Sequence, residues 1–173
     1  MNTQQITASN ATAEIRNLYE TSFPVEEQIP WTDLMRLVDV MSLDFTAYYD
    51  DALFVGFTIV YPRKEFNWYW YFAVQPDLQG QGYGQRILSQ LIDHYQGQPC
   101  VLDMESPTQP SDNIAQRQRR HDFYLRNGFH DTGVYRYFDD LCMTIMMMGE
   151  RPFSMQDWDV ILEELRSKLT IED

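Results

Sequence analysis

Hydrophobic positions near the N-terminus recur at the three- and four-residue spacing of amphipathic helices. This spacing predicts helices over residues 12–24 and 29–42, and a short first strand is expected at residues 5–9. The period then changes to runs rich in aromatic and β-branched residues, broken by Asp50-Asp51 and by Pro62-Arg63. Those runs predict three consecutive strands that pair as hairpins, at residues 43–51, 52–63 and 66–76.

The second half of the chain alternates between strand and helix patterns. A glycine-rich loop leads into an amphipathic helix that reaches about residue 95, followed by a short strand at 100–106 and a polar helix that ends at Asn127-Gly128. A hairpin turns at Asp139-Asp140, and a final helix begins near Ser154. This order predicts an α/β (α+β) fold around a mixed, mostly antiparallel central sheet flanked by helices.

Composition places the chain among globular proteins. Of 173 residues, 44% are hydrophobic and 14% aromatic, which suffices for a substantial core, and no Gly/Ser-rich linker divides the sequence. We therefore expect residues 1–173 to form a single domain. Two cysteines, Cys100 and Cys142, lie in apolar runs and are expected to be buried thiols.

Charge and hydropathy restrict the cellular compartment and the classes of binding partner that we expect. No apolar run is long enough for a membrane span and the first residues do not resemble a signal peptide, so we expect a cytoplasmic protein without membrane contact. The net charge of −13 disfavours nucleic acid, whose phosphates would be repelled. The same charge suits a cationic small molecule or peptide, although solubility alone also explains it.

The glycine-rich loop is the strongest chemical signal in the sequence. Gly80, Gly82 and Gly84 lie between a predicted strand and a predicted helix, where bare amide groups and the helix dipole would bind an anion. No Lys follows these glycines, which excludes a P-loop, and their spacing does not fit the dinucleotide-binding pattern G-x-G-x-x-G. A glycine-rich turn without a ligand is the alternative interpretation.

Two motifs together resemble the GNAT superfamily of N-acetyltransferases. Residues 79–84 (Gln-Gly-Gln-Gly-Tyr-Gly) are similar to that family's acetyl-coenzyme A loop, [RQ]-x-x-G-x-[GA]. About forty residues later, Phe123–Phe129 resembles its second signature, F-Y-x-x-x-G-F, with one strand between the two motifs. The resemblance covers about residues 5–148, so a C-terminal helix near 152–169 would extend the common core.

The resemblance implies that acetyl-CoA is the acyl donor. His94 and His130 show no metal-ligand spacing with other residues, so no metal site is expected. The strand before the loop would pair its backbone with the pantetheine arm, and the loop would hold the pyrophosphate. Gln79 stands where the family often has Arg, so backbone dipoles would carry most of that contact. The residues implied in cofactor binding are Phe72, Ala73, Val74, Gln79, Gly80, Gln81, Gly82, Tyr83, Gly84 and Gln85.

The resemblance also assigns two catalytic residues. Tyr124 matches the general acid that protonates the departing thiolate, the alternative being an aromatic residue at the end of a helix in the core. Glu105, at the end of the strand 100–106, is the candidate general base, with Asp103 as the second choice; either could instead orient the substrate. Arg117 and Arg120 replace the family's usual Asn and Ala, and could meet the adenosine 3′-phosphate or face solvent.

The expected function is therefore direct transfer of an acetyl group from acetyl-CoA to a primary amine, in a ternary complex. The acceptor would be a small molecule or peptide, and a cationic one is compatible with the charge. The alternative is a non-catalytic CoA-binding or protein-interaction module on the same fold. A homodimer is also compatible with the sequence, with the methionine-rich stretch near 142–148 as a candidate dimer edge.

Overall fold

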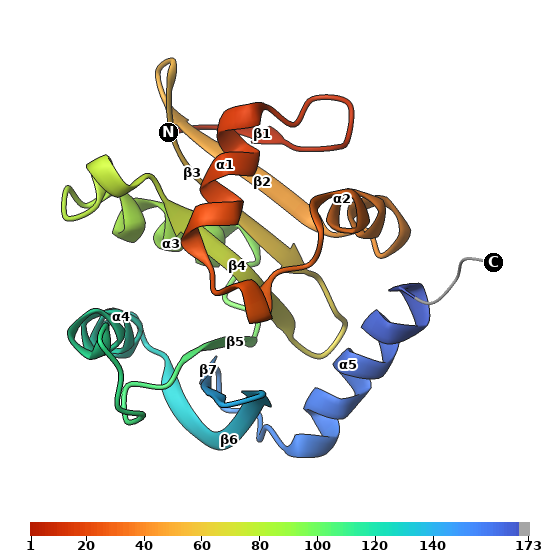
Figure 1. Ribbon diagram of the computed structural model, residues 1–173, viewed down its shortest axis with the longest axis vertical. Helices are drawn as coiled ribbons and strands as arrows, with labels where there is room; N and C mark the ends of the chain where they lie inside the picture. The colour runs from red at the N-terminus through yellow and green to blue at the C-terminus, as the bar shows by residue number, and fades with distance from the viewer. Residues whose placement is uncertain (170–173) are drawn as a thin grey trace.

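The computed structural model describes residues 1–169, in which helices cover both faces of one mixed sheet (Figure 1). The strands are β1 (Asn2–Gln5), β2 (Asp44–Asp50), β3 (Leu53–Tyr61), β4 (Asn67–Val74), β5 (Cys100–Glu105), β6 (His130–Phe138) and β7 (Leu141–Met148). The helices are α1 (Ala13–Ser22), α2 (Trp31–Val40), α3 (Tyr83–His94), α4 (Ile114–Arg126) and α5 (Met155–Leu169), with short 3-10 turns η1 (Val25–Glu27) and η2 (Pro76–Leu78).

The predicted class is confirmed. Within the described residues, seven strands form one sheet in the order β1-β2-β3-β4-β5-β7-β6. Every pairing is antiparallel except that of β4 with β5. No helix between residues 1 and 169 is both long and apolar enough to cross a bilayer.

The proposed dimer edge is wrong. β7 carries the methionine-rich stretch, and it lies between β5 and β6, so its backbone is paired on both sides. Met146 and Met147 are fully buried. The edges of the sheet within the described residues are β1 and β6 instead.

The first strand was also misplaced. β1 ends at Gln5 rather than continuing through residue 9. The side-chain oxygen of Asn10 accepts a hydrogen bond from the Thr7 amide at 2.8 Å, which closes a turn that ends the strand. Polar residues that capture nearby backbone amides in this way compete with strand pairing.

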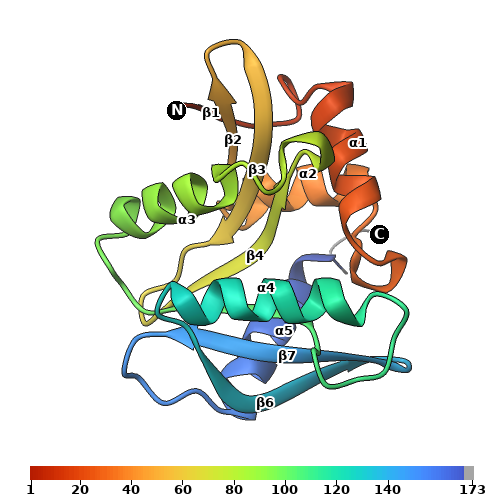
Figure 2. The ribbon, with the colours of Figure 1, turned by 90° about the vertical axis from the view of Figure 1, so that its left-hand side faces the viewer.

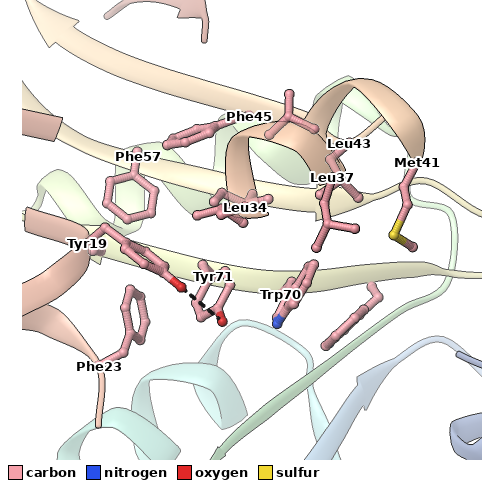
Figure 3. Close-up of a cluster of buried hydrophobic side chains, with 14 of the residues drawn as sticks. Tyr19, Phe23, Leu34, Leu37, Met41, Leu43, Phe45, Phe57, Trp70 and Tyr71 are labelled. Atoms are coloured by element: carbon pink, nitrogen blue, oxygen red, sulfur yellow. Dashed lines mark hydrogen bonds between the residues drawn. The ribbon is translucent and has the colours of Figure 1, made fainter. Parts of the chain in front are cut away.

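The helices divide between the two faces of the sheet. α1, α2 and α5 pack on one face against β2–β4, and α3 and α4 cover the other face (Figure 2). Figure 3 shows the centre of the first layer, where Tyr19 of α1 and Phe23, just after α1, meet Phe57 and Tyr71 of the sheet. The connection between α1 and α2 therefore crosses the sheet close to β4.

A β-bulge changes which side chains of β4 share a face. Simple alternation predicts Trp68 and Trp70 on one face and Tyr71 on the other. The register with β3 shifts instead, so that Ile59 lies opposite Tyr71 whereas Val60 lies opposite Tyr69, which leaves Trp70 as the extra residue. Trp70 and Tyr71 consequently stack on the same side, with ring centroids 5.1 Å apart.

Candidate active site

The site begins where β4 and β5 separate. These parallel strands pair only at Asn67 with Cys100 and Trp68 with Val101, so the rest of β4 has no hydrogen-bonded neighbour on that side. On its other side, the Gln75 amide donates to the Val55 carbonyl at 2.8 Å. Because successive residues of a strand point their backbone groups in opposite directions, those of Phe72 and Val74 face the opening.

The backbone carbonyl of Ala73 points away from the opening, toward β3, unlike the backbone groups of Phe72 and Val74. A Cβ placed on Gly56 of β3 would lie only 2.2 Å from the Ala73 carbonyl oxygen, so that oxygen faces β3 and only glycine fits at position 56. Of the three β4 residues implied in pantetheine contact, Phe72 and Val74 thus turn their backbone groups to the opening, where the Val74 carbonyl already accepts from the Gln79 side chain. Ala73 instead helps to hold β4 against β3.

The glycine loop presents bare backbone at the start of α3. Gly80 and Gly82 have φ angles of +76° and +86°, which L-residues rarely adopt, and a Cβ at either would meet no atom within 4 Å. The first α3 amide with a helical acceptor is that of Arg86, which donates to the Gly82 carbonyl at 3.1 Å. The preceding amides and the open space above them fit a pyrophosphate group.

The side chains of the loop are held by neighbouring backbone and side-chain groups. Gln79 donates to the Val74 carbonyl at 3.2 Å and Gln81 to the Asp77 carbonyl at 2.8 Å. The Tyr83 hydroxyl bonds Asp50 at 2.8 Å, and Gln85 accepts from Asn127 at the end of α4 at 3.0 Å. These contacts fix the loop between β4, α3 and α4.

Tyr124 lies where the second motif predicts, beside the separated strands. It is 3% exposed and packs against Phe129, with ring centroids 5.4 Å apart. It also lines a narrow slot together with Phe72 of β4, Leu102 of β5 and Arg120 of α4. The phenol therefore stands at the inner end of the opening between β4 and β5.

The two carboxylates predicted as bases are both paired with arginines. Glu105 accepts from Arg117 at 2.8 Å, and Asp103 accepts from Arg136 at 3.3 Å. Asp103 also accepts from the indole N–H of Trp68 at 3.1 Å. Each carboxylate is therefore already engaged by a guanidinium in the fold.

Glu27 lies in η1, next to β4. Tyr71 of β4 donates its hydroxyl to the Glu27 backbone carbonyl at 2.6 Å. Burial raises the pKa of the Glu27 carboxyl to about 8; Asp103 and Glu105 add to the rise, and Arg120 opposes it. No ion pair within residues 1–169 engages this carboxylate.

A polar cavity of about 300 Å³ adjoins these groups. It is bounded by the end of α1, the end of β5 and the first turns of α4. Arg120 lines both this cavity and the slot beside Tyr124, so the two spaces meet at its side chain. The lining consists of Thr21, Ser22, Phe23, Pro24, Met104, Glu105, Asn113, Gln116, Arg117 and Arg120.

A larger cavity of about 650 Å³ lies between α5 and the β3–β4 connection, lined by Tyr61, Arg63 and Glu164 among others. It is separate from Tyr124 and from the glycine loop, so we do not place the chemistry there. Within residues 1–169, no three His, Cys, Asp or Glu side chains are grouped so that they could hold a metal ion.

Comparison with known proteins decides the family. Residues 42–131 match the model of the acetyltransferase (GNAT) domain, which is more than half of the chain. The chain belongs to the GNAT acetyltransferase family. The matched stretch includes β4, the glycine loop and Tyr124, so both sequence motifs lie inside it.

Solved structures agree with the GNAT assignment. A protein assigned to the GNAT acetyltransferases from Bacteroides thetaiotaomicron is 28% identical, with 96% of this chain and 97% of that chain covered and a TM-score of 0.76. A GNAT acetyltransferase from Elizabethkingia anophelis with acetyl-CoA bound shares the fold at 16% identity, with coverages of 86% and 97% and a TM-score of 0.61. So does an aminoglycoside 6′-N-acetyltransferase complexed with coenzyme A, at 17% identity, 88% and 100% coverage and a TM-score of 0.63. No curated protein matches the chain.

The sequence pattern alone does not identify Glu27 and Arg120 of this GNAT protein as site residues. In the sequence, Glu27 is one of two adjacent acids in the connection between the first two helices, and Arg120 is a candidate cofactor contact or a solvent-facing residue. Arg120 instead lines the slot between β4 and β5, and Glu27 lies near enough to Asp103 and Arg120 for their charges to shift its pKa. The substitution of Arg for the family's small residue at position 120 was the one signal in the sequence that set this site apart.

Proposed function

We propose that this protein transfers an acetyl group from acetyl-CoA directly to a primary amine of a small molecule or peptide, in a ternary complex. The main support is the position of buried Tyr124 at the inner end of the opening between β4 and β5, with the glycine loop at the outer end. Acetyl-CoA, when bound, supplies the activated acetyl thioester.

The cofactor-binding role follows from the backbone that the chain leaves open. The amides at the start of α3 would hold the pyrophosphate, and the backbone of Phe72 together with the Val74 amide would align the pantetheine arm as an added strand. An amide that faces the opening would also polarise the acetyl carbonyl, a contribution typically worth a few kcal/mol. Gln79, Gln81, Tyr83 and Gln85 keep the loop in position through their own contacts.

Two proton transfers accompany the reaction. The ammonium of the acceptor must lose a proton before its nitrogen can attack, and the departing sulfur must gain one. Tyr124 is placed to donate the second proton from its hydroxyl. Glu105 stays a prediction for the base, but its ion pair with Arg117 weakens that role.

Glu27 is the better candidate for the base. Its carboxylate has no cationic partner within the described residues, and its pKa of about 8 is close to the range in which a base works best at neutral pH. The polar cavity of about 300 Å³, called the acceptor cavity below, lies between the end of α1, which leads into η1, and the start of α4. The acceptor amine would then have Glu27 on one side and the thioester on the other.

The test is an assay of free thiol released from acetyl-CoA with and without a panel of primary amines, with the acetylated product identified by mass spectrometry. Amine-dependent release with one product per thiol supports the proposal. Calorimetric binding of acetyl-CoA without product from any amine would instead favour a non-catalytic CoA-binding module.

A further inference from the structure

Among the charged groups that the structure describes around the opening between β4 and β5, Asp103 and Glu105 form ion pairs, whereas Arg120 and Glu27 do not. Asp103 is paired with Arg136 and Glu105 with Arg117, at 3.3 and 2.8 Å. Arg120 lies beside them, half-buried, and no carboxylate among the described residues approaches its guanidinium within ion-pair distance. Burial lowers the pKa of Arg120, but the neighbouring Tyr124 hydroxyl and the Glu27 carboxylate raise it above its usual value.

The remaining acid near Arg120 does not neutralise it at neutral pH. Burial raises the pKa of Glu27 to about 8, so at pH 7 most of its carboxyl groups are protonated. The acceptor side of the opening therefore carries a local positive charge, in a chain whose net charge is −13. A half-buried cation of this kind is most stable with an anion against it.

The position of Arg120 identifies which anion it can reach. Its side chain lines the 300 Å³ acceptor cavity as well as the slot beside Tyr124. The pyrophosphate loop contacts α4 at Asn127, which lies seven residues and about 10 Å further along the helix axis. Arg120 is thus directed at the acceptor end of the site and not at the phosphates of the cofactor.

We propose that the acceptor is an amine that carries a carboxylate, of the size of a free amino acid, and that Arg120 binds this carboxylate. The inference rests on the proposed acetyl-transfer function and names its substrate class. The planar guanidinium matches a carboxylate with two parallel N–H donors. The cavity volume is at the lower end of the range for small-molecule sites, which suits a molecule of this size.

The experiment compares free amino acids with their primary amides as acceptors, measuring thiol release and the acetylated product. The two differ in the carboxylate and keep the amine. We expect kcat/KM to be about 10- to 100-fold higher for the acids, the usual value of a charged hydrogen bond. Equal or better use of the amides would overturn the inference while leaving acetyl transfer intact.

Variants of α4 locate the effect. Arg120→Gln should remove the preference for the acid, mainly by raising its KM, whereas Arg119→Gln makes the same charge change at an exposed neighbour and should retain the preference. Arg120→Lys provides a second variant that keeps the charge, and should keep part of the preference. A fall in kcat that is equal for acids and amides would place Arg120 at the thioester and contradict the inference.

The failure of the broader proposal has a different signature. If calorimetry shows acetyl-CoA binding but neither acids nor amides yield an acetylated product, the acetyl-transfer function itself fails, and this inference fails with it. If amides are acetylated and acids are not, only the carboxylate assignment fails.

Discussion

The Tyr71 hydroxyl donates to the backbone carbonyl of Glu27 at 2.6 Å, which ties the connection between α1 and α2 to the bulged strand β4. The bulge at Trp70 is what turns Tyr71 to this side of the sheet. The same strand faces the opening with its free edge. A single element therefore positions both the proposed base and the backbone that would align the cofactor.

Removal of the Tyr71 hydroxyl should loosen η1 and weaken acceptor binding. We expect Tyr71→Phe to raise the KM for the acceptor several-fold and to lower the free energy of unfolding by about 1–2 kcal/mol, because the hydroxyl donates to the Glu27 carbonyl and accepts from Tyr19. Tyr61→Phe is the matched control, because the Tyr61 hydroxyl bonds Glu164 at 2.7 Å far from Tyr124. An acceptor KM that changes equally in both variants would refute the specific role of the Tyr71 contact.

Glu27 should set the pH dependence of the reaction. As a base with a pKa of about 8, it is active only when ionised, so kcat/KM should rise with pH to a plateau above about 8. Glu27→Gln should lower kcat/KM by about 10²-fold and remove this inflection. Glu26→Gln, at the exposed neighbouring position, should leave the profile unchanged. An unaltered profile in Glu27→Gln would return the role of base to Glu105 or to water.

The same carboxyl should weaken the fold at high pH. Its pKa is about 8 in the fold against 4.5 ordinarily, so between these values the folded state holds the proton more tightly than the unfolded state does. Stability should therefore decrease as pH rises from about 4.5 to 8. Glu27→Gln should raise the free energy of unfolding above pH 8 by about 1–3 kcal/mol, a value reduced for partial exposure. Urea unfolding at pH 5 and pH 9 measures this, and equal stability of both proteins at pH 9 would contradict it.

Tyr124→Phe should impair chemistry without disturbing structure. The ring packs against Phe129 and is nearly fully buried, so the variant keeps its packing and loses only the hydroxyl. We expect kcat to fall by about 10²-fold or more, with little change in acetyl-CoA affinity. Tyr95→Phe removes a hydroxyl that bonds Asp44 and should retain kcat. Full activity in Tyr124→Phe would leave Tyr124 as a core residue only.

Features that depend on neighbouring residues were predictable from the sequence. The glycine loop follows from Gly80 and Gly82, whose positive φ angles only glycine adopts freely. The start of α5 follows from Ser154 and Asp157, which exchange backbone and side-chain hydrogen bonds at 2.8 and 3.4 Å. Such contacts span three residues, so their pattern is visible in the sequence.

Features that depend on distant pairing were not predictable. The bulge at Trp70 arises from the register of β4 with β3, and nothing in the aromatic run marks it. The raised pKa of Glu27 depends on burial and on charges from β5, about 80 residues away. The ion pair that occupies Glu105 likewise needs α4 to fold against β5. A residue type alone indicates candidate chemistry, and the fold decides which candidate is free to perform it.

The most direct measurement is calorimetric titration of acetyl-CoA into the wild type, Gly82→Asp and Gly97→Asp. Both glycines have positive φ angles and open space where a Cβ would lie. An Asp at either position therefore introduces the same backbone strain and the same negative charge. The two variants differ in position, because Gly82 precedes α3 and Gly97 follows it. We expect micromolar binding to the wild type and to Gly97→Asp, and loss of binding in Gly82→Asp. Equal binding to all three proteins, or none to the wild type, would contradict this expectation.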